Sequence, residues 1–275
     1  TSGELEDIFS RGFVEYLPVL DEGRLHDIIT QENLSYFKGK KRRKQLNNAV
    51  VIMAGGKGTR LDPFTRILPK PLIPFGQKPI IKVIMDEFGS YDMKKFFVTL
   101  NDKGKMVKAY FHDHDLDYDI NFVEESQPLG TAGSLKLLEG KLLEPFFLSN
   151  CDIIIKSDYS KVLDFHMQRG NSLTLVASIH HHTVPYGVCE IANGGDLVSI
   201  REKPEYDFLT NTGLYLIDPS VINFIPQNEY FDMTDLIEEL KRNDANVGVF
   251  PVSEKSWIDI GQWAEYQKTI QNFES

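Results

Sequence analysis

An apolar run followed at once by a glycine-rich turn is the feature that most constrains the fold of this chain. The run covers residues 49–54, which is long enough for a buried strand, and it leads into Gly55, Gly56 and Gly58. Glycine adopts backbone conformations that are closed to other residues, and its missing Cβ atom lets a ligand approach the amides. Successive N–H groups in such a turn form a concavity that binds anions. The sequence therefore predicts a phosphate-binding loop at the end of a strand.

Two cations, Arg60 and Lys70, follow the turn and complete the parts of a polyphosphate site. Two better-known glycine motifs are excluded by inspection. A Walker A loop needs Lys and then Ser or Thr after its last glycine, but Gly58 is followed by Thr59 and Arg60. A Rossmann fingerprint needs a third glycine at the position where Leu61 stands. A glycine-rich connection with no ligand is the remaining alternative.

Composition limits the class of protein. With 275 residues, of which 41% are hydrophobic, the chain can bury a large core. It contains no apolar stretch of the roughly 18 to 20 residues that span a bilayer and no signal-peptide pattern, so we expect no membrane partner. Its two cysteines, Cys151 and Cys189, are too few for a disulfide framework, so a cytoplasmic location is expected. The net charge of −10 argues against nucleic-acid binding.

Residues 1–40 are predicted to form a small module. Its expected elements are a helix, two strands and a second helix, at residues 5–13, 16–20, 24–30 and 31–37. This order, with the wording Leu-Pro-Val-Leu-Asp-Glu-Gly-Arg-Leu, resembles the later part of a CBS motif, a module that binds adenosine nucleotides as a tandem pair. So small a piece has no core of its own, so it must pack on a larger domain, pair with another copy in a homo-oligomer, or be the remnant of a longer protein. Asn33 stands where a ribose-binding Asp would be expected, which counts against a nucleotide sensor here.

The rest of the chain is predicted to form one α/β domain. Residues 41–48 are basic and are interpreted as a solvated linker, with an interaction patch as the alternative. In residues 49–275, strands and helices then alternate, which predicts a doubly wound, mostly parallel, Rossmann-like sheet. The expected helices are at residues 80–88, 103–112 and 133–138, and the expected strands after the first are at 95–100, 120–123 and 146–149. Ligands bind at the carboxyl ends of the strands in such a sheet.

Later strands come without long helices between them. They are expected at residues 172–178, 187–191, 197–201 and 212–217. We expect them to form a mixed-sheet extension that covers the ligand site.

Two aspartates stand next to short apolar segments. Asp152 follows the strand at 146–149, and Asp259 lies between apolar residues in the segment 257–261. A carboxylate in a ligand crevice is unfavourable unless it is paired or binds a metal, and Mg²⁺ is typically held by one or two carboxylates plus substrate phosphates. The alternatives are that Asp152 caps the next turn and that Asp259 forms a structural salt bridge.

The pattern Gly-Gly-x-Gly-Thr-Arg-Leu, followed by Pro-Lys-Pro, resembles the signature of the sugar-1-phosphate nucleotidyltransferases (sugar-nucleotide pyrophosphorylases). The resemblance implies a GT-A type fold and a Mg²⁺ ion bound by Asp152 and Asp259. It also implies that Arg60 holds the β- and γ-phosphates of an NTP and that Lys70 holds the α-phosphate. The residues of the glycine turn implied to bind the nucleotide are Ala54, Gly55, Gly56, Gly58 and Thr59.

The segment Glu124–Gly133 resembles the base-binding loop of the guanylyltransferases in particular. Its wording, Glu-x-x-Pro-Leu-Gly-Thr-Ala-Gly, implies that backbone groups recognise the base and that GTP is preferred, with a uridylyl- or thymidylyltransferase as the alternative. A tight turn with no ligand is the alternative for residues 130–133. The further residues implied to bind the nucleotide are Glu124, Pro128, Gly130, Thr131 and Asn150.

The resemblance also places a sugar site. It implies that Gly187 contacts the sugar, that Glu202 binds its hydroxyls and that Lys203 pairs with its phosphate, while Asn211 and Thr212 complete the pocket. Two other groups are given no chemical role. Residues 180–182, three histidines in a row, are expected to be exposed polar surface, because adjacent side chains point in different directions. The two cysteines are interpreted as small buried residues.

The implied reaction converts NTP and a sugar 1-phosphate into NDP-sugar and pyrophosphate. A phosphate dianion is already a nucleophile near neutral pH, so catalysis needs positioning and charge neutralisation. The sugar would be a hexose or hexosamine, in bacterial surface-glycan or nonulosonate biosynthesis. The rival from another class is a non-catalytic regulatory subunit on the same fold, which typically lacks the arginine, the lysines or the metal-binding acids.

Overall fold

The computed structural model describes residues 43–56, 58–101, 103–114 and 117–261, and the backbone of two strands nearer the N-terminus, β1 (Tyr16–Asp21) and β2 (Arg24–Thr30). The chain separates into two compact units, Thr1–Lys44 and Gln45–Ser275.

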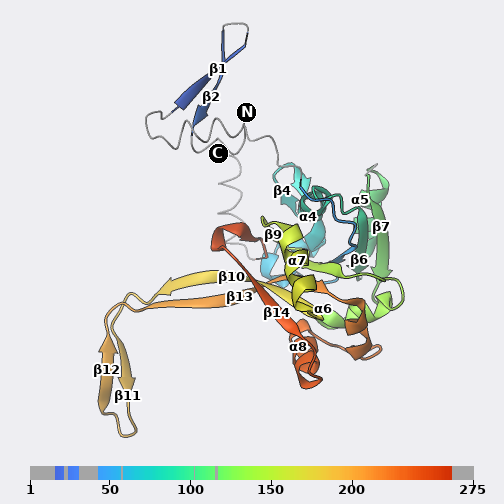
Figure 1. The fold of residues 1–275 in the computed structure, drawn as a ribbon. Helices are drawn as coiled ribbons and strands as arrows, with labels where there is room; N and C mark the ends of the chain where they lie inside the picture. Colours follow the sequence, from blue (N-terminus) through green and yellow to red (C-terminus); the bar gives the residue numbers. More distant parts are fainter. Residues whose placement is uncertain are drawn as a thin grey trace. The chain divides into compact units, whose positions relative to one another are not determined.

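In the N-terminal unit, β1 and β2 pair in an antiparallel hairpin with Tyr16 opposite Thr30 (Figure 1). Both strands occur where the sequence predicts them. The two helices expected on either side, and Asn33, lie outside the described residues. The resemblance to a CBS motif therefore stays a prediction.

A seven-stranded sheet forms the centre of the large unit, in the order β14-β10-β13-β8-β3-β6-β7. Every neighbouring pair is parallel except the two pairs made by β13, which runs against β8 and β10. The strands are β3 (Val50–Met53), β6 (Lys95–Leu100), β7 (Asp119–Glu124), β8 (Phe146–Asn150), β10 (Leu173–Thr183), β13 (Glu205–Ile217) and β14 (Val247–Val252). This confirms the predicted α/β fold class with its mostly parallel sheet.

Helices cover both faces of this sheet, because its central strands are apolar on both sides. In β3, Val50 and Ile52 belong to one buried cluster, and Val51 and Met53 belong to the other. The first cluster includes side chains of α4 (Ile80–Gly89), α5 (Gly104–His112) and α7 (Tyr159–Arg169). The second includes side chains of α6 (Gly130–Gly133), η3 (Ser134–Leu138), η4 (Pro219–Phe224) and α8 (Met233–Arg242).

Short elements carry the chain between these layers. After β3 come η1 (Thr59–Leu61), α3 (Phe64–Ile67), η2 (Lys70–Leu72), β4 (Pro74–Phe75) and β5 (Lys78–Pro79). A separate antiparallel pair joins β9 (Ile153–Ile155) to β15 (Trp257–Asp259), which follows η5 (Glu254–Ser256). None of the helices in the described part of the chain has the length and apolar character needed to cross a bilayer.

A hairpin extends β10 and β13 beyond the main sheet. At its end, β11 (Val188–Ile191) and β12 (Leu197–Arg201) form their own antiparallel pair (Figure 1). Most of its side chains are exposed, and none of them lines the cavities described below. The strands expected in a mixed-sheet extension are therefore present, but the expectation that they cover the site is wrong for this structure.

Candidate active site

The glycine-rich turn follows β3 at the carboxyl edge of the parallel strands, where it is held by its neighbours. The Ala54 N–H donates to Thr99 Oγ1 at 3.2 Å, and the Asn101 side-chain amide donates to the Gly55 carbonyl. A Cβ atom at Gly58 would lie 2.8 Å from Thr65 Cγ2 and 3.1 Å from Lys70 Cβ. Only glycine therefore lets the turn pack this closely against the segment that carries Lys70.

The turn forms one side of a cavity of about 510 Å³. The predicted nucleotide-binding residues that line this cavity are Gly55, Gly56, Gly58, Thr59, Pro128, Gly130, Thr131 and Asn150, and it is also lined by the predicted catalytic residues Arg60 and Lys70 and the predicted metal ligand Asp152. A second cavity of about 330 Å³ shares Gly56, Lys70, Glu125 and Pro128 with the first and is also lined by Ala54. The sequence-predicted nucleotide residues thus converge on two adjoining cavities, with the exceptions given below.

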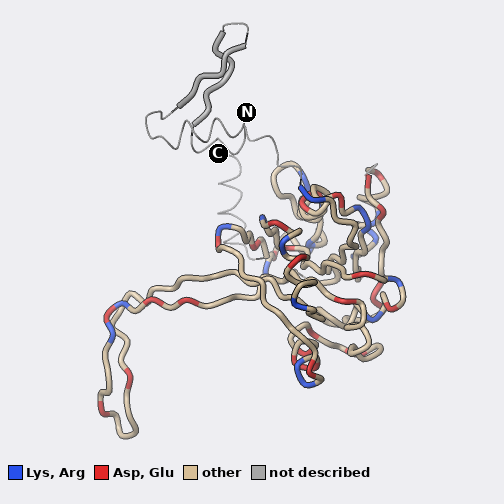
Figure 2. Tube along the Cα trace, viewed as in Figure 1, with Lys and Arg blue, Asp and Glu red and all other residues tan. Residues whose placement is uncertain are grey.

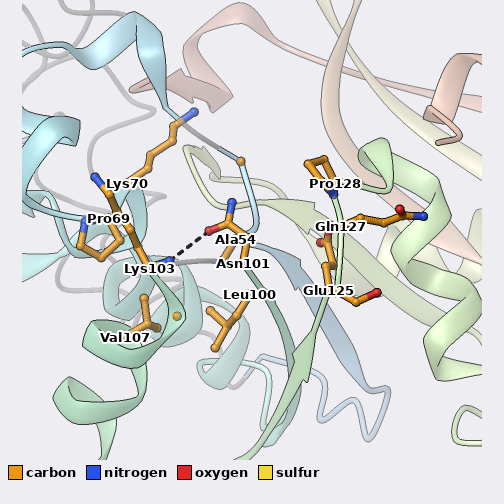
Figure 3. Close-up of a pocket in the computed structure, with 13 residues that line it drawn as sticks. Ala54, Pro69, Lys70, Leu100, Asn101, Lys103, Val107, Glu125, Gln127 and Pro128 are labelled. Atoms are coloured by element: carbon orange, nitrogen blue, oxygen red, sulfur yellow. Dashed lines mark hydrogen bonds between the residues drawn. The ribbon is translucent and has the colours of Figure 1, made fainter. Parts of the chain in front are cut away.

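The second cavity lies between two walls of different character (Figure 3). Lys70 and Lys103 lie on one side, and Glu125, Gln127 and Pro128 lie on the other, with Leu100 and Val107 giving it an apolar floor. Lys103 Nζ donates to the carbonyls of residues 65 and 66, so this cation is engaged at the end of α3. Glu125 and Pro128 line both cavities, so the two cavities adjoin at these residues.

Basic and acidic residues are interspersed along the domain, as Figure 2 shows. The positive charge at the first cavity therefore comes from the cations that line it, Arg60 and Lys70. Lys70 Nζ forms an ion pair with Asp152 Oδ2, and the two side chains are only 10% and 9% exposed. A charge buried to this extent is strongly unfavourable without its partner. The pair places a cation and a carboxylate side by side at the centre of the cavity wall.

A second carboxylate faces the first. Pairing of β15 with β9 sets Asp259 opposite Ile153, next to Asp152. A Cβ atom at Gly261 would collide with Asp152 Oδ2 and would lie 2.9 Å from Asp259 Oδ1, so both carboxylates face the space beside this glycine. Burial raises the pKa of Asp259, while the Gly261 N–H, which donates to its Oδ1 at 2.7 Å, lowers it and the charge of Asp152 raises it further.

Two converging carboxylates are the donor set that Mg²⁺ accepts when substrate phosphates complete its coordination. In the described part of the chain, no group of three or more His, Cys, Asp or Glu side chains is arranged to hold a metal. The residues present therefore fit an ion that is bound together with a substrate.

Of two adjacent glutamates, Glu125 lines both cavities, and the predicted Glu124 lines neither. Glu124 is exposed and forms an ion pair with Lys108. A Cβ atom at Gly55 would lie 2.6 Å from Glu125 Oε1, so the Glu125 carboxylate lies directly over the glycine turn. Burial raises the pKa of Glu125, and the Leu129 N–H, which donates to its Oε2 at 3.3 Å, partly offsets this effect.

Strand alternation could have identified Glu125 from the sequence. Val123 is buried in the sheet and Glu124, at the end of β7, is exposed, so the next side chain returns to the inner face.

In the loop after Glu125, backbone N–H groups donate hydrogen bonds to residues elsewhere in the chain. The N–H groups of Ala132 and Gly133 both donate to the Phe231 carbonyl at 2.9 Å, and the Thr131 N–H donates to Asp232 Oδ1 at 2.9 Å. These donors are not free for a base. The expectation that backbone groups of this segment recognise the base stays a prediction.

Of the predicted sugar residues on β13, neither directs its side chain into the cavities. The Thr212 hydroxyl is buried and donates to the Val176 carbonyl at 2.7 Å. The Asn211 amide donates to Tyr215 Oη at 2.7 Å. Asn150, by contrast, lines the first cavity, and its amide occupies the space that a side chain at Gly213 would fill.

The three predicted sugar residues on the hairpin lie together but apart from the cavities. A Cβ atom at Gly187 would lie 3.0 Å from Glu202 Oε2. The Lys203 N–H donates to the Tyr186 carbonyl at 3.2 Å, which closes the base of the β11–β12 pair. None of the three lines either cavity. Their role in sugar binding stays a prediction.

The sequence profile of the family described as Nucleotidyl transferase matches residues 49–275. The chain belongs to this family. Mannose-1-phosphate guanyltransferase of Saccharomyces cerevisiae is 32% identical in an alignment 228 residues long, which covers 77% of this chain and 61% of that protein. UTP–glucose-1-phosphate uridylyltransferase of a Synechocystis strain is 28% identical in an alignment 246 residues long, which covers 80% of this chain and 62% of that protein. The chain thus spans about three fifths of the length of these curated relatives.

Solved structures share the fold of this chain. HddC from Yersinia pseudotuberculosis, alone and complexed with GMP-PN, matches with a TM-score of 0.64 and 24% sequence identity. The alignment covers 82% of this chain and 99% of that one. At this identity the likeness shows the fold.

Of the remaining candidates, the three histidines and Cys189 line neither cavity, whereas Cys151 lines the first. His181 and His182 are exposed as expected, and a carboxylate of Asp207, 2.6 Å from His181 Nδ1, raises the pKa of that histidine. His180 is half-buried, with its ring against Trp257. Cys151 is buried, which raises its pKa to about 12. Cys189 is exposed on β11, so the prediction that it is buried is wrong, because the hairpin that carries it is not covered.

Proposed function

We propose that this nucleotidyl transferase converts an NTP and a sugar 1-phosphate into an NDP-sugar and pyrophosphate, with GTP as the nucleotide. The observation that carries the proposal is the cavity itself. A glycine-rich turn, Arg60 and the buried pair of Lys70 and Asp152 line one space of about 510 Å³, and the carboxylate of Asp259 lies beside that of Asp152. Cations and backbone amides that surround such a space stabilise phosphate charge.

The reaction forms one bond and breaks one. A phosphate oxygen of the sugar 1-phosphate attacks the α-phosphorus in line, the bond from that phosphorus to the bridging oxygen breaks, and pyrophosphate leaves with the electron pair. Arg60 would bind the β- and γ-phosphates as negative charge develops on them, Lys70 the α-phosphate, and Lys203 the sugar phosphate. Asp152 and Asp259 would hold Mg²⁺, which supplies further neutralisation of phosphate charge.

Glu125 supports guanine as the base. Guanine presents two neighbouring donors, N1–H and N2–H₂, and an ionised carboxylate offers two acceptors in matching positions. Uracil and thymine present an acceptor beside a donor, which suits a carboxamide better. The curated relatives include a mannose-1-phosphate guanyltransferase and a glucose-1-phosphate uridylyltransferase, so relatedness alone leaves both bases open.

We also propose a hexose or hexosamine 1-phosphate as the second substrate, cytoplasmic bacterial surface-glycan or nonulosonate biosynthesis as the setting, and homo-oligomer formation through the N-terminal unit. These three points rest on the sequence resemblance.

A substrate matrix tests the proposal. Pyrophosphate release is measured for GTP, UTP, dTTP, CTP and ATP at equal concentration against a panel of sugar 1-phosphates. We expect turnover with GTP to exceed that with each other nucleotide. The Glu125→Gln variant should shift preference toward UTP or dTTP, since mismatched polar groups in a buried site can reject a base by up to roughly 10⁴-fold. Nucleotide binding with no turnover on any sugar phosphate would favour the regulatory-subunit alternative.

A further inference from the structure

A segment about a hundred residues further along the chain fixes the loop that borders the base. This loop, residues 129–133, is bonded through its backbone to residues 231–233, which begin α8. The Phe231 N–H donates to the Leu129 carbonyl at 2.9 Å, and the Phe231 carbonyl accepts the two N–H groups already described. These backbone bonds fix the position of the loop relative to the start of α8.

Asp232 makes the side-chain part of this connection. Its Oδ1 accepts the Thr131 N–H at 2.9 Å and the Thr131 hydroxyl at 3.0 Å. The Thr131 Oγ1 in turn accepts the Met233 N–H at 2.9 Å, and Asp232 Oδ2 accepts the Tyr230 hydroxyl at 3.0 Å. A carboxylate that accepts several such bonds holds its donors more firmly than a neutral acceptor does.

The connection continues from Asp232 to the acid on the cavity wall. A Cβ atom at Gly130 would lie 2.9 Å from Asp232 Oδ1, so the carboxylate packs against the loop at Gly130 as well as at Thr131. The next residue back, Leu129, donates its N–H to Glu125 Oε2. Asp232, Thr131, Gly130 and Glu125 all line the same cavity. A displacement of the loop would therefore move the group that faces the base.

We propose that Asp232 is a positioning residue for nucleotide selection: it fixes the base loop through Thr131 and so holds Glu125 in place. This inference rests on the proposed function. It differs from a role in helix capping alone, because the bonds to Thr131 leave α8 and end in another part of the chain.

Asp235 provides a matched control on the same helix. It lies one turn into α8, and its Oδ2 accepts the Asp232 N–H at 2.9 Å. Asp232→Ala and Asp235→Ala therefore each remove a carboxylate from the beginning of α8, but only Asp232→Ala removes the bonds to Thr131. Asp232→Asn keeps an acceptor oxygen for Thr131 and serves as the conservative variant.

The experiment measures equilibrium binding of GTP and of UTP to the full chain, with Mg²⁺ and without sugar phosphate, beside the melting temperature. We expect Asp232→Ala to weaken GTP binding about tenfold and to reduce the ratio of GTP to UTP affinity, in line with the loss of charge-assisted hydrogen bonds. Asp235→Ala should lower the melting temperature by a similar amount and leave both affinities within about twofold. Asp232→Asn should restore most of the selectivity.

Equal affinities in Asp232→Ala and Asp235→Ala would overturn the inference. If Asp232→Ala does not fold, Thr131→Val, which removes only the hydroxyl bonds, should weaken GTP binding about threefold, and unchanged binding in that variant would overturn it too. A wild-type chain that binds none of the nucleotides would instead contradict the proposed function. The two failures are therefore distinguishable.

Discussion

Arg60 is an exposed side chain at the mouth of the cavity, so its charge can be removed without disturbing the core. We expect Arg60→Ala to lower kcat/KM by about two orders of magnitude or more, because a contact to a leaving group that gains charge strengthens in the transition state. The melting temperature should change little. Arg66→Ala is the control, since Arg66 is 73% exposed and pairs with Asp62 outside the cavity. Near-wild-type turnover in Arg60→Ala would remove this arginine from the site.

Glu125 should make the affinity for GTP depend on pH. Burial raises the pKa of this carboxyl in the free protein, and only the ionised form accepts both guanine donors. Bound guanine favours the ionised form and lowers this pKa. GTP affinity should therefore be highest above the pKa of the free protein and fall by up to about tenfold for each pH unit below it. Titration of GTP binding between pH 4 and 8 measures this, and the same slope in Glu125→Gln would contradict it.

For individual side chains, the sequence predicted which residue types the site contains better than it predicted which neighbouring residue faces the cavity. Arg60, Lys70 and Asp152 could be named from motif spacing, because the two cations follow the glycine turn and Asp152 follows the strand β8. Two acids stand side by side at the end of β7, and the alternation of side chains along that strand, which favours Glu125 as the inward-facing one, was not applied to them. Thr212 could not be assigned from sequence either, since its hydroxyl is satisfied by a carbonyl of a neighbouring strand.

A substitution at Gly130 tests whether the base loop, residues 129–133, can be displaced while the domain stays folded. Gly130 has φ +80° and a Cβ atom there would lie 2.6 Å from the Phe231 carbonyl oxygen, while Gly140 has φ +75° with no neighbouring atom within 4 Å of such a Cβ. Gly130→Ala and Gly140→Ala should both lose about 1–2 kcal/mol of stability from backbone strain. Only Gly130→Ala should also weaken nucleotide binding, by tenfold or more, because the loop must move away from Phe231. Equal nucleotide affinities in the two variants would contradict this.

Asp152→Asn and Asp259→Asn, two variants beside the β9–β15 pair, should both lose the metal ion but should change the stability of the fold differently. Asp152→Asn leaves Lys70 buried without its counter-charge and should destabilise the fold by about 3 kcal/mol. Asp259→Asn removes a carboxylate whose pKa burial raises, so its stability should be unchanged or higher. Both should lose Mg²⁺-dependent activity, and chelation should abolish wild-type activity. Full activity in chelator would contradict the assignment of both acids.

The sequence predicted the inner elements well and the outer ones poorly. An apolar run indicates a strand buried on both faces, so β6 begins and ends where expected. The helices α7 and α8 and the strand β14 were not predicted, although the buried residues of α8, Met233, Leu236 and Leu240, recur at helical spacing. The β11–β12 hairpin was predicted as strands, but strand periodicity does not say whether a hairpin covers a site.

The division of the whole chain into two units gives the last prediction. The large unit begins at Gln45 and its first residues are already part of the core: Leu46 is 3% exposed, its N–H donates to the Tyr91 carbonyl at 2.7 Å, and the Asn48 amide donates to the Pro145 carbonyl at 2.7 Å. A chain that starts at Lys44 should therefore fold, bind GTP with unchanged affinity and melt near the full-length temperature.

A chain that starts at Ala49 loses these anchors. Loss of a buried Leu side chain costs about 2–5 kcal/mol, and for a domain of this size each kcal/mol lowers the melting temperature by about 2–4 °C. Thermal unfolding of the two truncated chains should thus differ by at least about 4 °C, with the shorter chain less stable. Equal melting temperatures would show that residues 45–48 do not belong to the core of the large unit, and a loss of GTP binding in the longer one would show that the N-terminal unit contributes to the site.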